Sequence, residues 1–156
     1  MTTTNEARTT LLTDPVAQQL LQATPLARLA YTWMDGTPRV VPMWFQWTGE
    51  VFLLGAPPNA PKMKALAHHP RVALSIDSDA WPYKVLTVRG TAAIELVEWT
   101  FPEYAAMAQR YLGEEGGQAF LALGGQTFSR WGRIAIRPDA VRVLDFATQL
   151  PSAWSA

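Results

Sequence analysis

The order of motifs between Gly36 and Gly90 decides the fold of this chain. An Asp-Gly turn leads into Arg-Val-Val-Pro-Met (39–43), whose β-branched residues are typical of a strand. The proline-rich loop Gly-Ala-Pro-Pro-Asn-Ala-Pro (55–61) runs into Lys-Met-Lys-Ala-Leu (62–66), which predicts a short helix. A long strand follows, beginning Pro-Tyr-Lys-Val-Leu-Thr-Val-Arg-Gly (82–90). Two strands with a lysine-bearing helix between them have the spacing required by a site for a flat ring with an anionic tail.

Outside this stretch, strands continue to outnumber helices. Asp14-Pro15 is typical of an N-cap followed by proline at the first helical position, and it predicts a helix to about Ala23. Thr100-Phe101-Pro102-Glu103 has the spacing of a capping box and predicts a helix that Gly113–Gly117 breaks. A further short helix is expected before a hinge or turn at Gly124-Gly125. Strands are predicted at residues 26–33, 39–47, 51–54, 71–77, 84–96 (the longest), 131–137 and 141–146.

Six or seven mostly antiparallel strands with short helices predict a mainly β fold, in which the sheet forms a closed or nearly closed barrel. The chain shows no internal repeat and no linker, so residues 1–156 are predicted to be one domain, with residues 1–10 as a flexible arm. Both faces of the 39–47 strand are largely apolar, and both are expected to be covered. Pro42 has no N–H, which indicates an edge strand, a bulge, or backbone that faces something other than a strand.

Composition excludes several classes of function. The chain of 156 residues carries 13 Lys and Arg against 13 Asp and Glu, with no basic run, which argues against nucleic acid or an anionic membrane as a partner. The absence of cysteine excludes disulfides, thiolate nucleophiles and zinc–thiolate sites, and a cytoplasmic location is expected. The first ten residues lack the apolar region of a signal peptide, and no apolar run approaches the ~20 residues of a membrane span. His68 and His69 point in different directions on a helix without a third ligand, so no metal site is predicted.

The candidate site residues follow from what a phosphate-bearing flat cofactor needs. Phosphate favours a cation beside the free backbone N–H groups of a helix N-terminus. This assigns Lys62, with Lys64 two residues later and Arg39 at the start of the 39–47 strand. The backbone of residues 40–43, freed from pairing at Pro42, is placed to meet the edge of the ring. The alternative is that the two lysines simply form a solvated helix face.

The order of these motifs resembles the pyridoxamine 5′-phosphate oxidase-like family of flavin- and deazaflavin-dependent split β-barrel oxidoreductases, over roughly residues 25–146. Arg39-Val40-Val41 matches the family strand that lies along the isoalloxazine, and Lys62 corresponds to the family's phosphate-binding lysine. The serine and arginine that precede this lysine in the family are replaced here by Ala60-Pro61. The chain also ends Leu-Pro-Ser-Ala-Trp-Ser-Ala (150–156) instead of the family's Arg-Leu-x-Pro type of ending, which disfavours vitamin B6 oxidation.

The resemblance implies a split β-barrel oxidoreductase that binds FMN, or alternatively a deazaflavin coenzyme, and transfers hydride between the ring and a small organic substrate. It also implies a homodimer with the cofactor at the subunit interface. Tyr83, on the loop before a flavin-side strand, is the candidate catalytic residue, the alternative being a tyrosine that only packs its ring locally. The cofactor-binding candidates are Arg39, Val40, Val41, Pro42, Met43, Leu54, Gly55, Lys62, Met63, Lys64 and Trp131. Two other functions are considered: a non-catalytic flavin carrier or sensor, and a haem-handling barrel with His68 or His69 as axial ligand.

Overall fold

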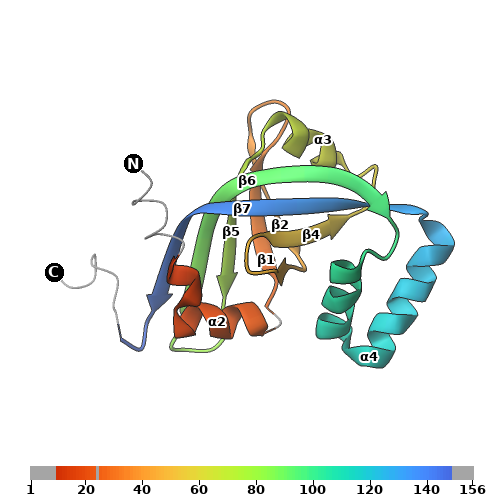
Figure 1. Cartoon of the computed structure of the whole chain (residues 1–156). Coiled ribbons are helices and arrows are strands. Elements are labelled where there is room, and N and C mark those ends of the chain that lie inside the picture. Colours follow the sequence, from red (N-terminus) through yellow and green to blue (C-terminus); the bar gives the residue numbers. More distant parts are fainter. Residues whose placement is uncertain (1–9, 24, 149–156) are drawn as a thin grey trace.

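The fold is seen in a computed structural model, which describes residues 10–23 and 25–148 (Figure 1). One 3₁₀ helix, three α-helices and seven strands are found in this part of the chain. In chain order the elements are η1 (Thr10–Thr13), α2 (Pro15–Gln22), β1 (Ala27–Thr32), β2 (Pro38–Met43), β3 (Gln46–Trp47), β4 (Phe52–Ala56), α3 (Pro61–His68), β5 (Arg71–Asp77), β6 (Lys84–Glu98), α4 (Pro102–Thr127) and β7 (Arg130–Asp145). The predicted arm lies outside the described residues except for Thr10, which begins η1.

The strands form one antiparallel sheet in the order β2-β1-β5-β6-β7-β4-β3. The strands β2 and β3 are joined only by Trp44 and Phe45, yet they lie at opposite edges of the sheet. The sheet must therefore roll until its two edges approach each other. The predicted mainly β fold of split-barrel type is confirmed, although no ladder between β2 and β3 closes the barrel within the described residues.

Three of the predicted strands are divided differently in the structure. The predicted 39–47 strand is divided at Trp44-Phe45, because the chain leaves one edge of the sheet there to reach the other. The two strands predicted at 131–137 and 141–146 are one strand, β7, which is one residue longer than β6. Its pairing with β6 shifts where Arg89 lies opposite Ala140 and Gly90 lies opposite Pro138. Asp139 is therefore the extra residue of a β-bulge, which lets the proline stay inside a continuous strand.

The helix ends show which local signals were decisive. Asp14 caps α2 as predicted, because its carboxylate accepts a hydrogen bond of 2.8 Å from the backbone N–H of Val16. The capping box predicted at Thr100 does not form: Phe101 is the N-cap of α4, and Thr100 has a φ of 67°. The predicted break falls at Gly113, where a φ of 77° and a ψ of 174° turn α4 into a helical hairpin beyond the ends of β6 and β7 (Figure 1).

The hinge predicted at Gly124-Gly125 was wrong, since α4 continues through both glycines. A Cβ atom on Gly124 would lie 2.9 Å from Cε2 of Trp99 and closer still to two other atoms of the same six-membered ring. The indole N–H of Trp99 also donates to the carbonyl of Leu121 at 3.0 Å. The glycine thus lets the second half of α4 pack flat against this indole, and no backbone freedom is involved. None of the described helices is both long enough and apolar enough to cross a membrane.

At the edge of the sheet, the rest of the chain covers only one face of β2. The inward residues of the barrel are fully buried, among them Leu29, Leu74 and Ile136. On β2, however, Val40 is 68% exposed and Pro42 is also exposed, so the expectation that both faces of this strand are covered fails within one chain. Of the three alternatives that Pro42 left open, the structure shows the edge strand, because β2 pairs with β1 alone.

Candidate functional site

A cavity of about 370 Å³ lies at the seam where the two sheet edges approach each other. The strand β2 and the crossover to β3 form one wall, β4 and the start of α3 form a second, and both halves of the α4 hairpin form a third. The residues that line it are Leu26, Val41, Pro42, Met43, Trp44, Gly55, Lys62, Tyr104 and Phe120.

Lys62 brings a positive charge to this cavity. Its helix begins with Pro61 and has Ala60 at the N-cap, which makes no side-chain capping hydrogen bond. Pro61 has no N–H and the N–H of Met63 donates to the carbonyl of Ala60 at 2.9 Å, so the backbone N–H of Lys62 is the first-turn donor for which no acceptor is found among the described residues. This N–H group, the helix dipole and the ammonium of Lys62 together favour an anion at this point.

Aromatic rings make up the α4 side of the cavity. Trp44 stacks on Tyr111 with ring centroids 5.1 Å apart and an interplanar angle of 5°. Phe120, from the second half of α4, lies 5.2 Å from Trp44 and 6.4 Å from Tyr104, which belongs to the first half. Flat aromatic surfaces of this kind suit a planar ligand and exclude water from one side of it.

The floor of the cavity depends on the absence of a side chain at Gly55. A Cβ atom there would lie 2.6 Å from Nε1 of Trp131 and would also overlap the ring of Tyr104. Burial raises the pKa of Tyr104 to about 12. The indole Nε1 of Trp131 is buried without a hydrogen-bond acceptor, so an unused donor lies beneath the cavity.

Arg110 holds the α4 wall in place. Its guanidinium donates to the carbonyls of Leu21 at 2.7 Å and Ala23 at 3.0 Å, and also to the carbonyl of Phe45 in the crossover. It lies over the rings of Phe45 and Tyr111 at 4.7 and 4.9 Å. Removal from water lowers the pKa of this guanidinium. One side chain therefore joins α4, the end of α2 and the crossover that carries Trp44.

The structure brings five of the predicted cofactor-binding residues together. Val41, Pro42, Met43, Gly55 and Lys62 all line the cavity described above. They come from β2, β4 and α3, which adjoin one another only because the sheet rolls. The sequence assigned these residues to the edge of a ring and to an anionic tail, and those roles stay predictions.

The remaining cofactor candidates on β2 and α3 lie outside the cavity. Arg39 is exposed with its guanidinium 4.5 Å from the centre of the Trp33 ring, and Val40 points away to solvent. Met63 is buried against Gly132. Lys64 is exposed on α3 and, two residues beyond Lys62, lies on another side of the helix.

The last predicted residues lie below or away from the cavity. Leu54 is fully buried in the barrel core, and Trp131 lies behind Gly55 rather than on the cavity surface. Tyr83 is 43% exposed and packs edge-on against Trp81 and Phe146, beside a different hollow. Within one chain, Tyr83 therefore has no contact with the cavity that holds Lys62.

Sequence reasoning missed four of the lining residues: Leu26, Trp44, Tyr104 and Phe120. Tyr104 and Phe120 fall in segments that were predicted as helix, with no site motif around either residue. The signal that was present is the density of aromatic residues in α4 and the crossover, but which of these rings face a cavity depends on tertiary packing.

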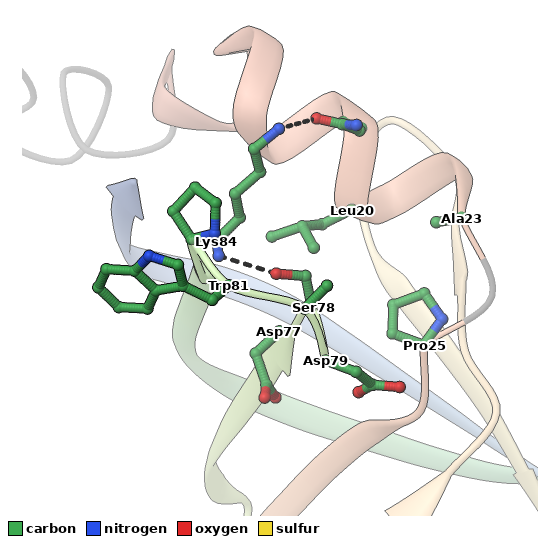
Figure 2. A pocket seen from close by; sticks show the side chains of 11 residues that line it. Leu20, Ala23, Pro25, Asp77, Ser78, Asp79, Trp81 and Lys84 are labelled. Carbon is green, nitrogen blue, oxygen red and sulfur yellow. Dashed lines mark hydrogen bonds between the residues drawn. The ribbon is translucent and has the colours of Figure 1, made fainter. Parts of the chain in front are cut away.

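A larger cavity of about 470 Å³ lies between α2 and the loop that joins β5 to β6 (Figure 2). Lys84 extends across it and donates to Gln19, so its ammonium already has a partner. Asp77 and Asp79 add carboxylates, the first paired with Arg28. The surroundings are therefore less suited to an anion than those of Lys62. The residues that line it are Gln19, Leu20, Ala23, Pro25, Asp77, Ser78, Asp79, Ala80, Trp81, Pro82 and Lys84.

No three side chains of the metal-ligating types His, Cys, Asp and Glu lie close enough together to hold a metal ion within residues 10–23 and 25–148. The rings of His68 and His69 are 6.5 Å apart at the C-terminal end of α3, and neither lines the cavity.

The fold and the cavity define a split-barrel protein whose site suits a planar ligand with an anionic end. Residues 13–145 match the family described as pyridoxamine 5′-phosphate oxidase, and the chain belongs to this family. No protein in the curated set matches the chain.

Solved structures share the fold. A structure named F420 reductase is 29% identical, covers 80% of this chain and 94% of its own, and has a TM-score of 0.62. The conserved hypothetical protein Rv2991 from Mycobacterium tuberculosis is 21% identical, with a TM-score of 0.65 and 85% of each chain covered. HutZ, the haem storage protein from Vibrio cholerae, is 19% identical, with a TM-score of 0.62, and covers 83% of this chain and 93% of its own.

Proposed function

We propose that this protein binds FMN, or alternatively a deazaflavin coenzyme, in the Lys62 cavity and works as an oxidoreductase on a small organic substrate. The observation that carries the proposal is the convergence of an uncapped helix start, its lysine and an aromatic wall on one cavity. Family membership and the 29% identical F420 reductase support the same reading. The bound ring would accept or donate the hydride, and the protein would supply the surroundings.

The residues of the chain have distinct roles in this proposal. Lys62 and the first turn of α3 bind the anionic end of the cofactor. The backbone of β2 at Val41 and Pro42 meets the ring, because an edge strand has free polar groups on one side. Trp44 and Phe120 exclude water from the cavity and hold a flat ligand against β2. A role for Tyr83 in catalysis stays a prediction, as does a substrate other than vitamin B6.

We also propose a homodimer with the cofactor between the subunits. Support comes from the exposed edge strand β2, where Val40 is 68% exposed beside the cavity-lining Val41 and Pro42. Apolar side chains on an unpaired sheet edge are usually covered in the native assembly. A molar mass of two chains in light scattering is expected, and the mass of a single chain would contradict this assembly. A cytoplasmic location stays a prediction from the sequence.

The test compares cofactor binding by Lys62→Gln with that by Lys64→Gln, which removes the same charge two residues along the same helix. Loss of a charge-assisted contact of ~1.5–3 kcal/mol is expected to weaken FMN or deazaflavin binding by roughly 10- to 150-fold for Lys62→Gln. Lys64→Gln should bind as the unmodified protein does, since Lys64 does not line the cavity. Equal effects of the two substitutions would contradict the assignment of the phosphate to Lys62.

Measurements of turnover, of the absorption spectrum and of cofactor binding separate the proposal from its alternatives. A protein that binds FMN tightly but does not oxidise or reduce any small electrophile would be a carrier or sensor. A Soret band that is lost when His68 and His69 are both changed to Ala would indicate haem handling. Binding of neither FMN nor deazaflavin would refute the cofactor proposal.

A further inference from the structure

Three arginines lie close together on the outer face of β6 and β7. The inward residues of these strands alternate with outward ones, and the outward set includes Arg89, Arg137 and Arg142, all exposed. Arg89 is paired across the strands with Ala140, between the pairs Thr87–Arg142 and Thr91–Arg137. Arg89 is therefore a diagonal neighbour of both arginines of β7.

These arginines have no counterion among the residues that the structure describes. None of the three takes part in a salt bridge or a side-chain hydrogen bond found in the described part of the chain. The one carboxylate in the bulge, Asp139, is bound to Arg71 at 2.9 Å. The whole chain has a formal net charge of zero, so this concentration of unpaired positive charge is a local feature of the β6–β7 face.

A hollow of about 270 Å³ lies between two of these arginines. Its lining consists of Thr87, Arg89, Ala140, Val141 and Arg142. The small side chain of Ala140 leaves room opposite Arg89, and the hydroxyl of Thr87 adds a hydrogen-bond donor beside Arg142. The hollow shares no residue with the Lys62 cavity.

We propose that Arg89 and Arg142 bind an oxyanion, a phosphate or carboxylate group, in this hollow. Diagonal neighbours on adjacent strands lie ~7–8 Å apart, a separation that two long side chains close around one small anion. Guanidinium groups suit such groups because their N–H donors form paired hydrogen bonds with two oxygens. An anion between them also removes the repulsion between the two like charges.

The proposal is tested by titrating the full-length protein with pyrophosphate in a calorimeter. Binding is expected for the unmodified protein, and Arg89→Gln and Arg142→Gln should each weaken it roughly 10-fold or more, since a charge-assisted contact is lost. Arg130→Gln removes the same charge at the far end of β7, where Arg130 bonds to the carbonyl of Leu96, and should leave binding unchanged. All three substituted positions are exposed arginines, and circular dichroism checks that each variant is folded.

Unchanged pyrophosphate binding in the Arg89→Gln, Arg142→Gln double variant would overturn the proposal, as would no binding by the unmodified protein. A second titration identifies the source of the oxyanion. If it is the phosphate of a bound cofactor, the double variant weakens FMN but not riboflavin, and pyrophosphate competes with FMN. If it is a separate substrate or ligand, FMN and pyrophosphate bind together. Either result keeps the site, and the first would move the cofactor phosphate from Lys62 to these two arginines.

Discussion

Replacing Arg110 by Met should destabilise the protein while keeping a side chain of similar length. The substitution leaves the carbonyls of Leu21, Ala23 and Phe45 without their donor. Ala23 is exposed, so water replaces that bond at little cost. The other two carbonyls lie beside buried side chains, and an unsatisfied buried acceptor costs ~1–3 kcal/mol. The expected loss of unfolding free energy is about 2–4 kcal/mol, because removal of the desolvated charge offsets part of the total.

Urea denaturation followed by tryptophan fluorescence measures this loss. For a denaturant slope of about 2 kcal/mol per molar urea, the midpoint should fall by about 1–2 M. Arg110→Lys keeps the charge but not the planar fork, so an intermediate midpoint is expected. The near-ultraviolet circular dichroism should also change, because Trp44 stacks on Tyr111 next to this arginine. A Met variant that unfolds at the original midpoint would refute the idea that Arg110 joins three elements.

Two further predictions concern α4. Gly124→Ala should destabilise the protein by about 1–3 kcal/mol despite the better helix propensity of alanine, because the new methyl group overlaps Trp99. Gly125→Ala, whose Cβ would lie 3.3 Å from the same indole, should be near neutral in the same urea assay, and equal losses would contradict the packing argument. Stability should also fall between pH 10 and 12, because unfolded tyrosine loses its proton near pH 10 while Tyr104 keeps its proton to about 12. At pH 11 this linkage amounts to about 1.4 kcal/mol relative to pH 9, and Tyr104→Phe should lack that part of the decrease. An identical pH dependence in the two proteins would show that Tyr104 is not responsible.

The parts of the fold that were predictable are determined by residues that are adjacent in the sequence. Asp14 and Pro15 carry the information needed to begin α2, and Pro42 limits its position to an edge strand, a bulge or backbone that faces something other than a strand. The division at Trp44-Phe45 was not predictable, because both halves of that segment have the composition of a strand. Only the rolled sheet, which places those halves at opposite edges, requires the break. Likewise, Thr100 has the spacing of a cap, but burial of Phe101 sets where α4 begins.

The candidate site shows the same division. Lys62 and Gly55 were predictable because the chemistry of phosphate binding and the resemblance both point to a short local motif. Tyr104 and Phe120 were not, because they reach the cavity from two halves of a hairpin far along the chain. Arg89 and Arg142 were not predictable as a site either, because only the pairing of β6 with β7 places them beside one hollow.

The crossover at Trp44-Phe45 has a consequence for the order of folding. The hairpin of β1 and β2 and the ladder between β5 and β6 pair elements that are close in sequence. The pairing of β4 with β7, in contrast, must wait for β5, β6 and the whole of α4 to be synthesised. Contacts so distant in sequence form slowly, since a long loop must close first. The Lys62 cavity comes into existence only with that last pairing, because Gly55 lies on β4 and is paired with Arg133 of β7. A ligand for this cavity therefore binds completed molecules alone, and it would slow unfolding without accelerating the early steps of folding.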